Sequence, residues 1–125
     1  MIGQLGDSLV VVTWFATPWR GDRFEEAWAP VAEAALDYGA TAYAFYRDQE
    51  ERARFTQLAF GFDTKLDWER YWYSEEVVAA RERASGLFQV PIIPEWQRLV
   101  GFGSRALVPV AEWASGPPGG SRPGA

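Results

Sequence analysis

The sequence predicts an α+β domain in which a four-stranded antiparallel sheet carries helices on one face. Alternating or continuous apolar runs predict strands over four separate stretches. Two stretches with apolar residues at helical spacing lie after the first strand and after the third. Turn and capping residues separate each stretch from the next, so the element order is β-α-β-β-α-β. That order, within a chain of 125 residues that is long enough for one domain, is the ferredoxin-like arrangement.

The first part of the chain predicts a strand and a helix. The run from Leu9 to Phe15 is rich in β-branched and aromatic residues, as strands are. Asp22 and Glu25 have the spacing of a capping box, which predicts that a helix begins at Asp22. Pro30 favours a kink inside this helix, and Gly39 is expected to end it.

The remaining elements follow from similar signals. Residues 41–47 and 54–62 are predicted to form a hairpin of two strands around a charged turn. Residues 63–73 carry a dense aromatic run and predict a short helix or helical turn. A second long helix is expected from Ser74, as N-cap, to Gly86 at its C-terminal end. Residues 95–102 are predicted to form the fourth strand.

These elements divide the chain into a domain over residues 9–104, an N-terminal lead over residues 1–8 and a C-terminal extension. Residues 105–114 form an arm whose apolar part, Val108 to Trp113, could contact a partner. Residues 115–125 contain Gly, Pro and Ser and offer nothing to a core, so this tail is expected to be disordered.

Both faces of the predicted strands are apolar. In the first strand, Leu9, Val11 and Phe15 alternate with Val10, Val12 and Trp14, and the next two strands show the same pattern. Helices on one face of the sheet would leave the other exposed, which is unfavourable for a monomer. We therefore expect two copies to pair sheet to sheet as a homodimer, with the geometry of an α+β barrel.

The composition excludes several kinds of chemistry. The chain has no His, no Cys and no Asn, so Ser-His and Cys-His nucleophiles, thiolate redox chemistry and the usual zinc and haem ligands are missing. No acidic cluster predicts a metal site, and no cofactor is expected. A net charge of −5 argues against nucleic acid as a partner. No apolar stretch is long enough to span a membrane, and the lack of cysteine fits a cytoplasmic location.

Two short segments resemble a known superfamily. Trp72, Ser74, Glu75 and Glu76 lead into the second long helix, and the run Trp96-Gln97-Arg98-Leu99-Val100 follows Pro94 in the closing strand. With the element order, over roughly residues 8–102, these segments resemble the dimeric α+β barrel superfamily and, within it, antibiotic biosynthesis monooxygenase-like domains.

The resemblance implies a homodimer with a ligand between the helices and the sheet of each subunit. Members include cofactor-independent oxygenases of polycyclic phenols, haem-degrading enzymes, small isomerases and cyclases, and proteins without known activity. The related helix often carries a His about seven residues after its Ser, and Arg81 stands there in this chain. Haem degradation in the family uses a His and an Asn, and both are missing.

The aromatic run between Asp63 and Glu76 is the candidate ligand site. Trp68, Tyr71 and Trp72 share a helical face, which predicts either an aromatic core or the wall of a pocket for a flat ligand. Arg81 could pair with a phenolate or carboxylate, or it could belong to a solvated helix end. The ligand-binding candidates are therefore Trp14, Phe60, Trp68, Tyr71, Trp72 and Arg81.

Other polar groups in this region have two interpretations. Asp67 and Glu69 could provide a base if buried, although acidic residues at a helix start are ordinary. Tyr43, Tyr46, Tyr71 and Tyr73 could each donate a hydrogen bond to a substrate oxygen, and no catalytic residue can be chosen among them.

Two functions remain open. One is a non-catalytic dimer that binds a hydrophobic or aromatic small molecule or serves as a subunit of a larger protein assembly. The other is a cofactor-independent monooxygenase or isomerase that acts on a phenolic or quinone-like substrate, for which the protein supplies positioning and desolvation.

Overall fold

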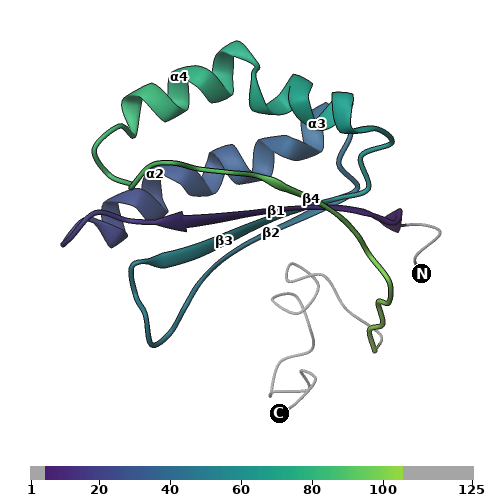
Figure 1. The fold of residues 1–125 in the computed structure, drawn as a ribbon, viewed down its shortest axis with the longest axis horizontal. Coiled ribbons are helices and arrows are strands. Elements are labelled where there is room, and N and C mark those ends of the chain that lie inside the picture. The colour runs from purple at the N-terminus through teal and green to yellow at the C-terminus, as the bar shows by residue number, and fades with distance from the viewer. Residues whose placement is uncertain (1–4, 106–125) are drawn as a thin grey trace, which may run out of the picture.

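The computed structural model describes residues 5–105 and has the predicted α+β architecture (Figure 1). The predicted arm and tail beyond Arg105, and the first four residues of the predicted lead, lie outside the described residues. The elements in chain order are β1 (Ser8–Phe15), α2 (Gly21–Glu33), the 3-10 helix η1 (Ala34–Tyr38), β2 (Ala42–Arg47), β3 (Arg54–Phe60), α3 (Lys65–Trp72), α4 (Glu75–Arg83) and β4 (Glu95–Arg98).

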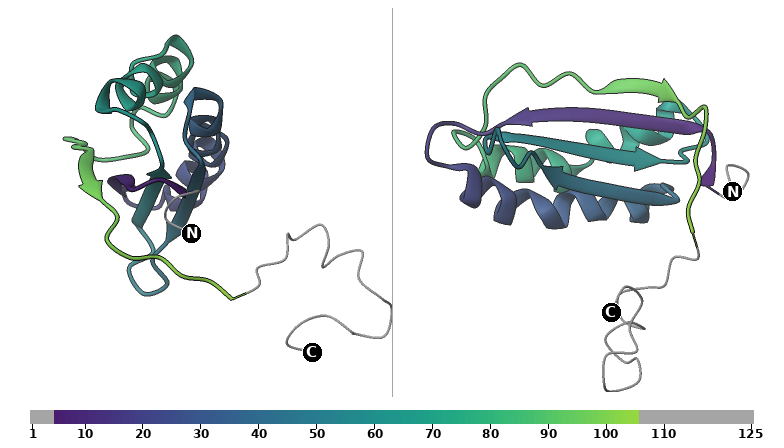
Figure 2. Two further views of the ribbon diagram at one scale, coloured as in Figure 1. Left: turned by 90° about the vertical axis from the view of Figure 1, so that its right-hand side faces the viewer. Right: turned by 90° about the horizontal axis from the view of Figure 1, so that it is seen from below.

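The four strands form one antiparallel sheet in the order β2-β3-β1-β4. Its register is fixed by Val11 opposite Leu58 and by Leu58 opposite Ala44. The helices all lie on one face of this sheet, and no helix or strand of the described residues lies on the opposite face (Figure 2). The fold class expected from the sequence is confirmed. The pairing of two sheets stays a prediction.

The first helix differs from its prediction at its N-terminus. It begins at Gly21 rather than Asp22, and no side chain caps it. Asp22 and Glu25 do not form the expected capping box. They pair instead with Arg47, whose Nη1 lies 2.7 Å from Asp22 and 3.2 Å from Glu25. The Asp22 carboxylate binds Arg47 of β2 instead of capping the helix. The hydrogen bond from Arg47 lowers the pKa of the Asp22 carboxyl.

The helix also changes type before it ends. Pro30 is accommodated within α2, and after Glu33 the chain tightens into η1. Gly39 closes this segment with a φ of 108°, which only glycine adopts readily, so the predicted stop is correct.

Strands β3 and β4 are shorter than predicted. β3 ends at Phe60 because Gly61 takes a φ of 80° and turns Phe62 into the core, where it is 2% exposed. β4 ends at Arg98, which pairs with Ser8, the first residue of β1. Residues 5–7, which precede β1, are not in a strand, so residues 99–102 have no strand among the described residues with which to continue the predicted pairing.

The two helices after the hairpin have well-formed N-termini. Thr64 caps α3 in a capping box with Asp67, whose carboxylate accepts from the Thr64 backbone in return. Ser74 caps α4 as predicted, by accepting from the Val77 N–H. None of the described helices has the length and apolar character needed to cross a membrane.

Candidate functional site

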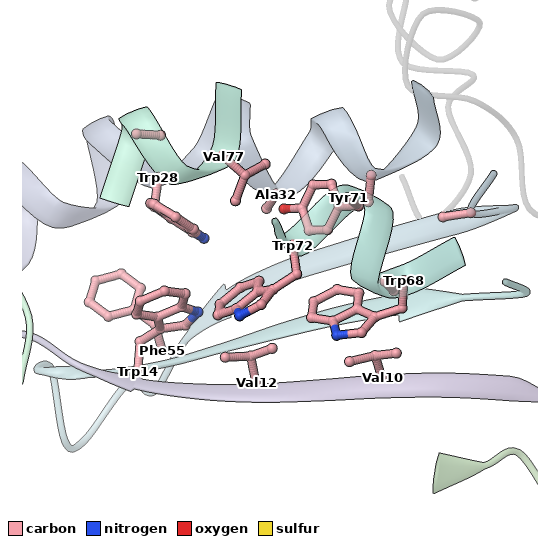
Figure 3. Close-up of a cluster of buried hydrophobic side chains, with 14 of the residues drawn as sticks. Val10, Val12, Trp14, Trp28, Ala32, Phe55, Trp68, Tyr71, Trp72 and Val77 are labelled. Atoms are coloured by element: carbon pink, nitrogen blue, oxygen red, sulfur yellow. The ribbon is translucent and has the colours of Figure 1, made fainter. Parts of the chain in front are cut away.

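The space between sheet and helices is filled by aromatic rings (Figure 3). Trp14 from β1 contacts Trp28 from α2 at a centroid distance of 4.6 Å and Trp72 from α3 at 5.9 Å. Trp72 in turn stacks on Trp68 at 5.2 Å. Trp14 and Trp28 are 0% exposed, Trp68 is 4% and Trp72 is 6% exposed. The aromatic run that the sequence singled out is therefore part of the core that joins helices to sheet.

One polar side chain, Gln57 of β3, lies among these rings. Its Oε1 accepts the indole N–H of Trp28 at 2.9 Å and that of Trp14 at 3.2 Å. Its Nε2 donates to the Tyr71 hydroxyl at 2.9 Å, and that hydroxyl donates to the Val31 carbonyl of α2 at 2.7 Å. This network ties β1, β3, α2 and α3 together, and its hydroxyl and indole groups are used internally rather than offered to a ligand.

Burial raises the pKa of the Tyr71 phenol. Tyr71 therefore holds its proton more tightly in the folded than in the unfolded chain. Above the usual tyrosine pKa of 10.0, unfolding releases a proton, so stability is fully present below that pH and falls as pH rises.

We expect Tyr71→Phe to change the alkaline behaviour of the protein. Wild type should lose stability above about pH 10 by up to ~1.4 kcal/mol per pH unit from this group. The variant should be less stable than wild type at neutral pH, but its stability should fall less than that of wild type as the pH rises further. Urea unfolding at a series of pH values measures this, with Tyr46→Phe, at an exposed position, as the control. If the free energy of unfolding decreased equally with pH in wild type and Tyr71→Phe, the expectation would be contradicted.

Arg81 lies against the end of α3, a contact that the sequence did not predict. Its guanidinium lies 4.3 Å from the centroid of the Trp72 ring and donates from Nη1 to the Trp72 carbonyl at 2.8 Å. Arg81 thus binds the C-terminal carbonyl of α3 and stacks on its last aromatic residue. Partial burial lowers its pKa below the usual arginine value.

A surface pocket of about 390 Å³ adjoins this arginine. Val78 and Phe88 give it apolar walls, and Arg81 and Glu82 contribute charge. No ion pair within residues 5–105 involves Arg81. The pocket therefore combines apolar surface with a cation that has no carboxylate partner among those residues.

The six candidate residues do not all meet. Trp14, Trp68, Tyr71 and Trp72 lie in one cluster between sheet and helices, with Arg81 on its outer edge. Phe60 lies on the opposite face of the sheet, since it alternates along β3 with the buried Ala59 and Gln57. A ligand held by the first five would not touch it.

The other polar candidates have ordinary positions. Asp67 belongs to the capping box of α3 and also pairs with Arg70 at 3.2 Å, while Glu69 is exposed. Tyr43, Tyr46 and Tyr73 are exposed, and only Tyr71 is fully buried. Within the described residues, no group of three or more acidic side chains could hold a metal ion.

Sequence reasoning missed Gln57 and Trp28. A signal for Gln57 was present, because it is a polar residue on the apolar side of an alternating strand, between Phe55 and Ala59. Buried polar side chains usually have hydrogen-bond partners, so this position predicted a polar contact inside the core. Which groups would meet it depended on tertiary packing.

Comparison with known proteins gives structural relatives only. No protein-family model matches the chain, and no curated protein matches it significantly. Among solved structures, a provisionally named antibiotic biosynthesis monooxygenase from Nitrosomonas europaea is 12% identical, covers 74% of this chain and 89% of its own, and gives a TM-score of 0.65. A protein of the same provisional name from Deinococcus radiodurans is 13% identical. The match covers 81% of this chain and 99% of that protein, with a TM-score of 0.62. A conserved protein from Methanosarcina mazei is 16% identical. The match covers 79% of this chain and 99% of that protein, with a TM-score of 0.65.

At these identities the likeness establishes the fold. The resemblance found in the sequence is thus confirmed at that level: the chain has the ferredoxin-like α+β fold of the antibiotic biosynthesis monooxygenase-like proteins.

Proposed function

We propose that the chain is a self-associating, non-catalytic subunit in which two copies pair through the open faces of their sheets. The observation that carries the proposal is how the apolar side chains are divided. On the helix side they fill the interior, and on the open side no helix or strand within residues 5–105 covers them. The open-face residues follow from the strand register: Leu9, Val11, Phe15, Ala42, Ala44, Tyr46, Leu58 and Phe60.

Energetic considerations support pairing through this face. Phe15 is 38% and Tyr46 is 53% exposed. Across β1 and β3 the face also carries the uncharged Thr13 and Thr56, and its charged residues, Arg54 and Glu95, lie at the start of β3 and on the edge strand β4. Each square ångström of apolar surface removed from water contributes roughly 25 cal/mol. A second sheet packed about 10 Å above the first would bury all four strands at once.

The filled interior also bears on catalysis. An oxygenase or isomerase of a phenolic substrate would need room for a flat ring between helices and sheet. The rings of Trp14, Trp28 and Trp72 occupy that space, and the Tyr71 hydroxyl is committed to Gln57 and Val31. This packing favours the non-catalytic function over catalysis in the interior.

Sedimentation velocity tests the proposal. Wild type is expected to sediment as a dimer at micromolar concentration, and Leu58→Glu, at the centre of the open face, as a monomer. A carboxylate buried without a partner should weaken pairing by at least about a hundredfold. The matched control is Leu66→Glu, because Leu66 is 56% exposed on α3 and lies away from that face. A monomeric wild type, or a control that dissociates equally, would refute sheet-to-sheet pairing.

A second candidate function has one specific observation in its favour, the pocket beside Arg81. A guanidinium that has no carboxylate partner among residues 5–105 and lies next to Val78 and Phe88 suits a flat or hydrophobic molecule with a phenolate or carboxylate. If such a molecule were also oxidised there, the protein would be a cofactor-independent monooxygenase.

Titration with 1-naphthoate and 2-naphtholate tests this second function. Arg81→Gln should weaken binding about tenfold or more relative to Arg83→Gln, a nearby exposed arginine on the same helix. Oxygen consumption with hydroquinone and anthrone substrates then separates a binder from an oxygenase. Binding that is equal in the two variants would exclude Arg81 as the anion partner.

A further inference from the structure

A groove of about 480 Å³ is lined by residues of α2, η1 and α4, most of them exposed. One wall is a stripe along α2 and η1 that consists of Ala27, Val31 and Ala34. The other wall is a stripe along α4 formed by Glu76, Ala80 and Arg83. Both stripes have the spacing i, i+4, i+7, so each runs about 10 Å, or two helical turns.

The groove exists because the facing side chains are too small to fill it. Ala80 is 5% exposed and forms part of the floor, and Val31 and Ala34 are half-buried beside it. Leu36 is 43% exposed and also lines the groove. An apolar floor open to water over two turns is the shape into which another helix can place aliphatic side chains at i, i+3/i+4 and i+7.

The groove is acidic. Glu33, Asp37 and Glu76 contribute three carboxylates against the single guanidinium of Arg83. None of the ion pairs within residues 5–105 involves these four side chains. A partner with cationic residues beside its apolar stripe is therefore complementary, and an acidic partner is repelled.

We propose that this groove docks a basic amphipathic helix of another protein, with aliphatic residues on the floor and Lys or Arg against the acidic rim. The charge argues against the chain's own C-terminal segment, because residues 106–125 contain one Arg and one Glu and so no excess of basic side chains. The groove and the open sheet face lie on opposite sides of the sheet, so a partner helix and a second copy could bind together (Figure 2).

The probe is a synthetic helix about 16 residues long, since shorter isolated helices are marginal in water. It has Leu at i, i+3, i+4 and i+7 and Lys elsewhere, with an N-terminal fluorescein for anisotropy at about 0.15 M salt. Wild type is expected to bind one peptide per chain. A peptide of the same composition, scrambled to remove the apolar stripe, should bind at least about tenfold more weakly.

Two groove variants have matched controls. Glu33→Lys/Asp37→Lys should weaken binding at least about tenfold, whereas Glu50→Lys/Glu51→Lys, with the same charge change on the exposed β2–β3 turn, should weaken it far less. Ala27→Trp, which fills the groove from an exposed position, should also reduce binding, and circular dichroism checks its fold. Glu76→Gln is the milder variant if either change unfolds the chain.

Three outcomes would overturn the docking proposal: no binding to wild type, equal loss in the two charge-reversed proteins, or equal binding of the scrambled peptide. Leu58→Glu is expected to bind the peptide as wild type does. The docking proposal and the proposal of sheet pairing can therefore fail separately.

Discussion

Replacing Trp72 by alanine is expected to lower the free energy of unfolding by about 3–5 kcal/mol. The ring is 6% exposed, stacks on Trp68 at 5.2 Å and packs against Trp14 at 5.9 Å. Arg81 lies over its outer side at 4.3 Å, so the truncation removes a stacking partner from the guanidinium as well. A void at this junction cannot collapse easily, because the large rings of Trp14 on β1 and Trp68 one turn earlier on α3 border it.

Chemical denaturation of the variant and wild type measures this loss. Trp19→Ala is the control, because the Trp19 side chain is 100% exposed and its removal should change stability by no more than about 0.5 kcal/mol. The comparison separates the loss of a packed indole from the loss of any indole. If Trp72→Ala lowered the free energy of unfolding by less than about 1 kcal/mol, the ring would not be a packed core residue. That result would support the interpretation of Trp72 as part of a ligand pocket.

Local patterns in the sequence predicted the elements and their order. The alternation in Leu9 to Phe15 and the Ser74 cap are signals that residues a few positions apart carry together, and both are present in the structure. The two apolar faces of each strand could be predicted for the same reason, because alternation along a strand is a local pattern. What covers each face depends on tertiary packing, and within residues 5–105 helices cover one face of the sheet.

The errors arose where a distant residue decided the outcome. Asp22 and Glu25 had the spacing of a capping box, yet Arg47 lies close enough to pair with both. Phe62 continued the pattern of a strand, but the positive φ of Gly61 turned it into the core. The contacts of Arg81 with the end of α3 were also not predicted, because spacing along α4 does not reveal them. Its role at a ligand stays a prediction.

The second large effect is expected at Gln57. Gln57→Leu keeps the approximate volume of the side chain but removes the acceptor for Trp14 and Trp28 and the donor to Tyr71. Each buried donor left without an acceptor costs about 1–3 kcal/mol. We therefore expect a loss of about 2–5 kcal/mol in the free energy of unfolding, although the substitution makes the core more apolar.

A surface glutamine provides the control for this experiment. Gln49 lies exposed in the β2–β3 turn, and Gln49→Leu should change stability by no more than about 0.5 kcal/mol. If Gln57→Leu were neutral or stabilising, the indole N–H groups would have found other partners, and the polar contact would not be needed to define the core.

A double variant distinguishes the loss of hydrogen bonds from simple misfit. Trp28→Phe removes the donor of the 2.9 Å bond to Gln57, so in Gln57→Leu/Trp28→Phe that donor is no longer left unpaired. The double variant should be more stable than the sum of the single losses predicts, with a coupling of about 1–2 kcal/mol. Strict additivity would mean that Gln57 contributes by shape alone. A measured coupling would instead support the view that the amide fixes β3, α2 and α3 in one arrangement, with no group left free for a ligand in the interior.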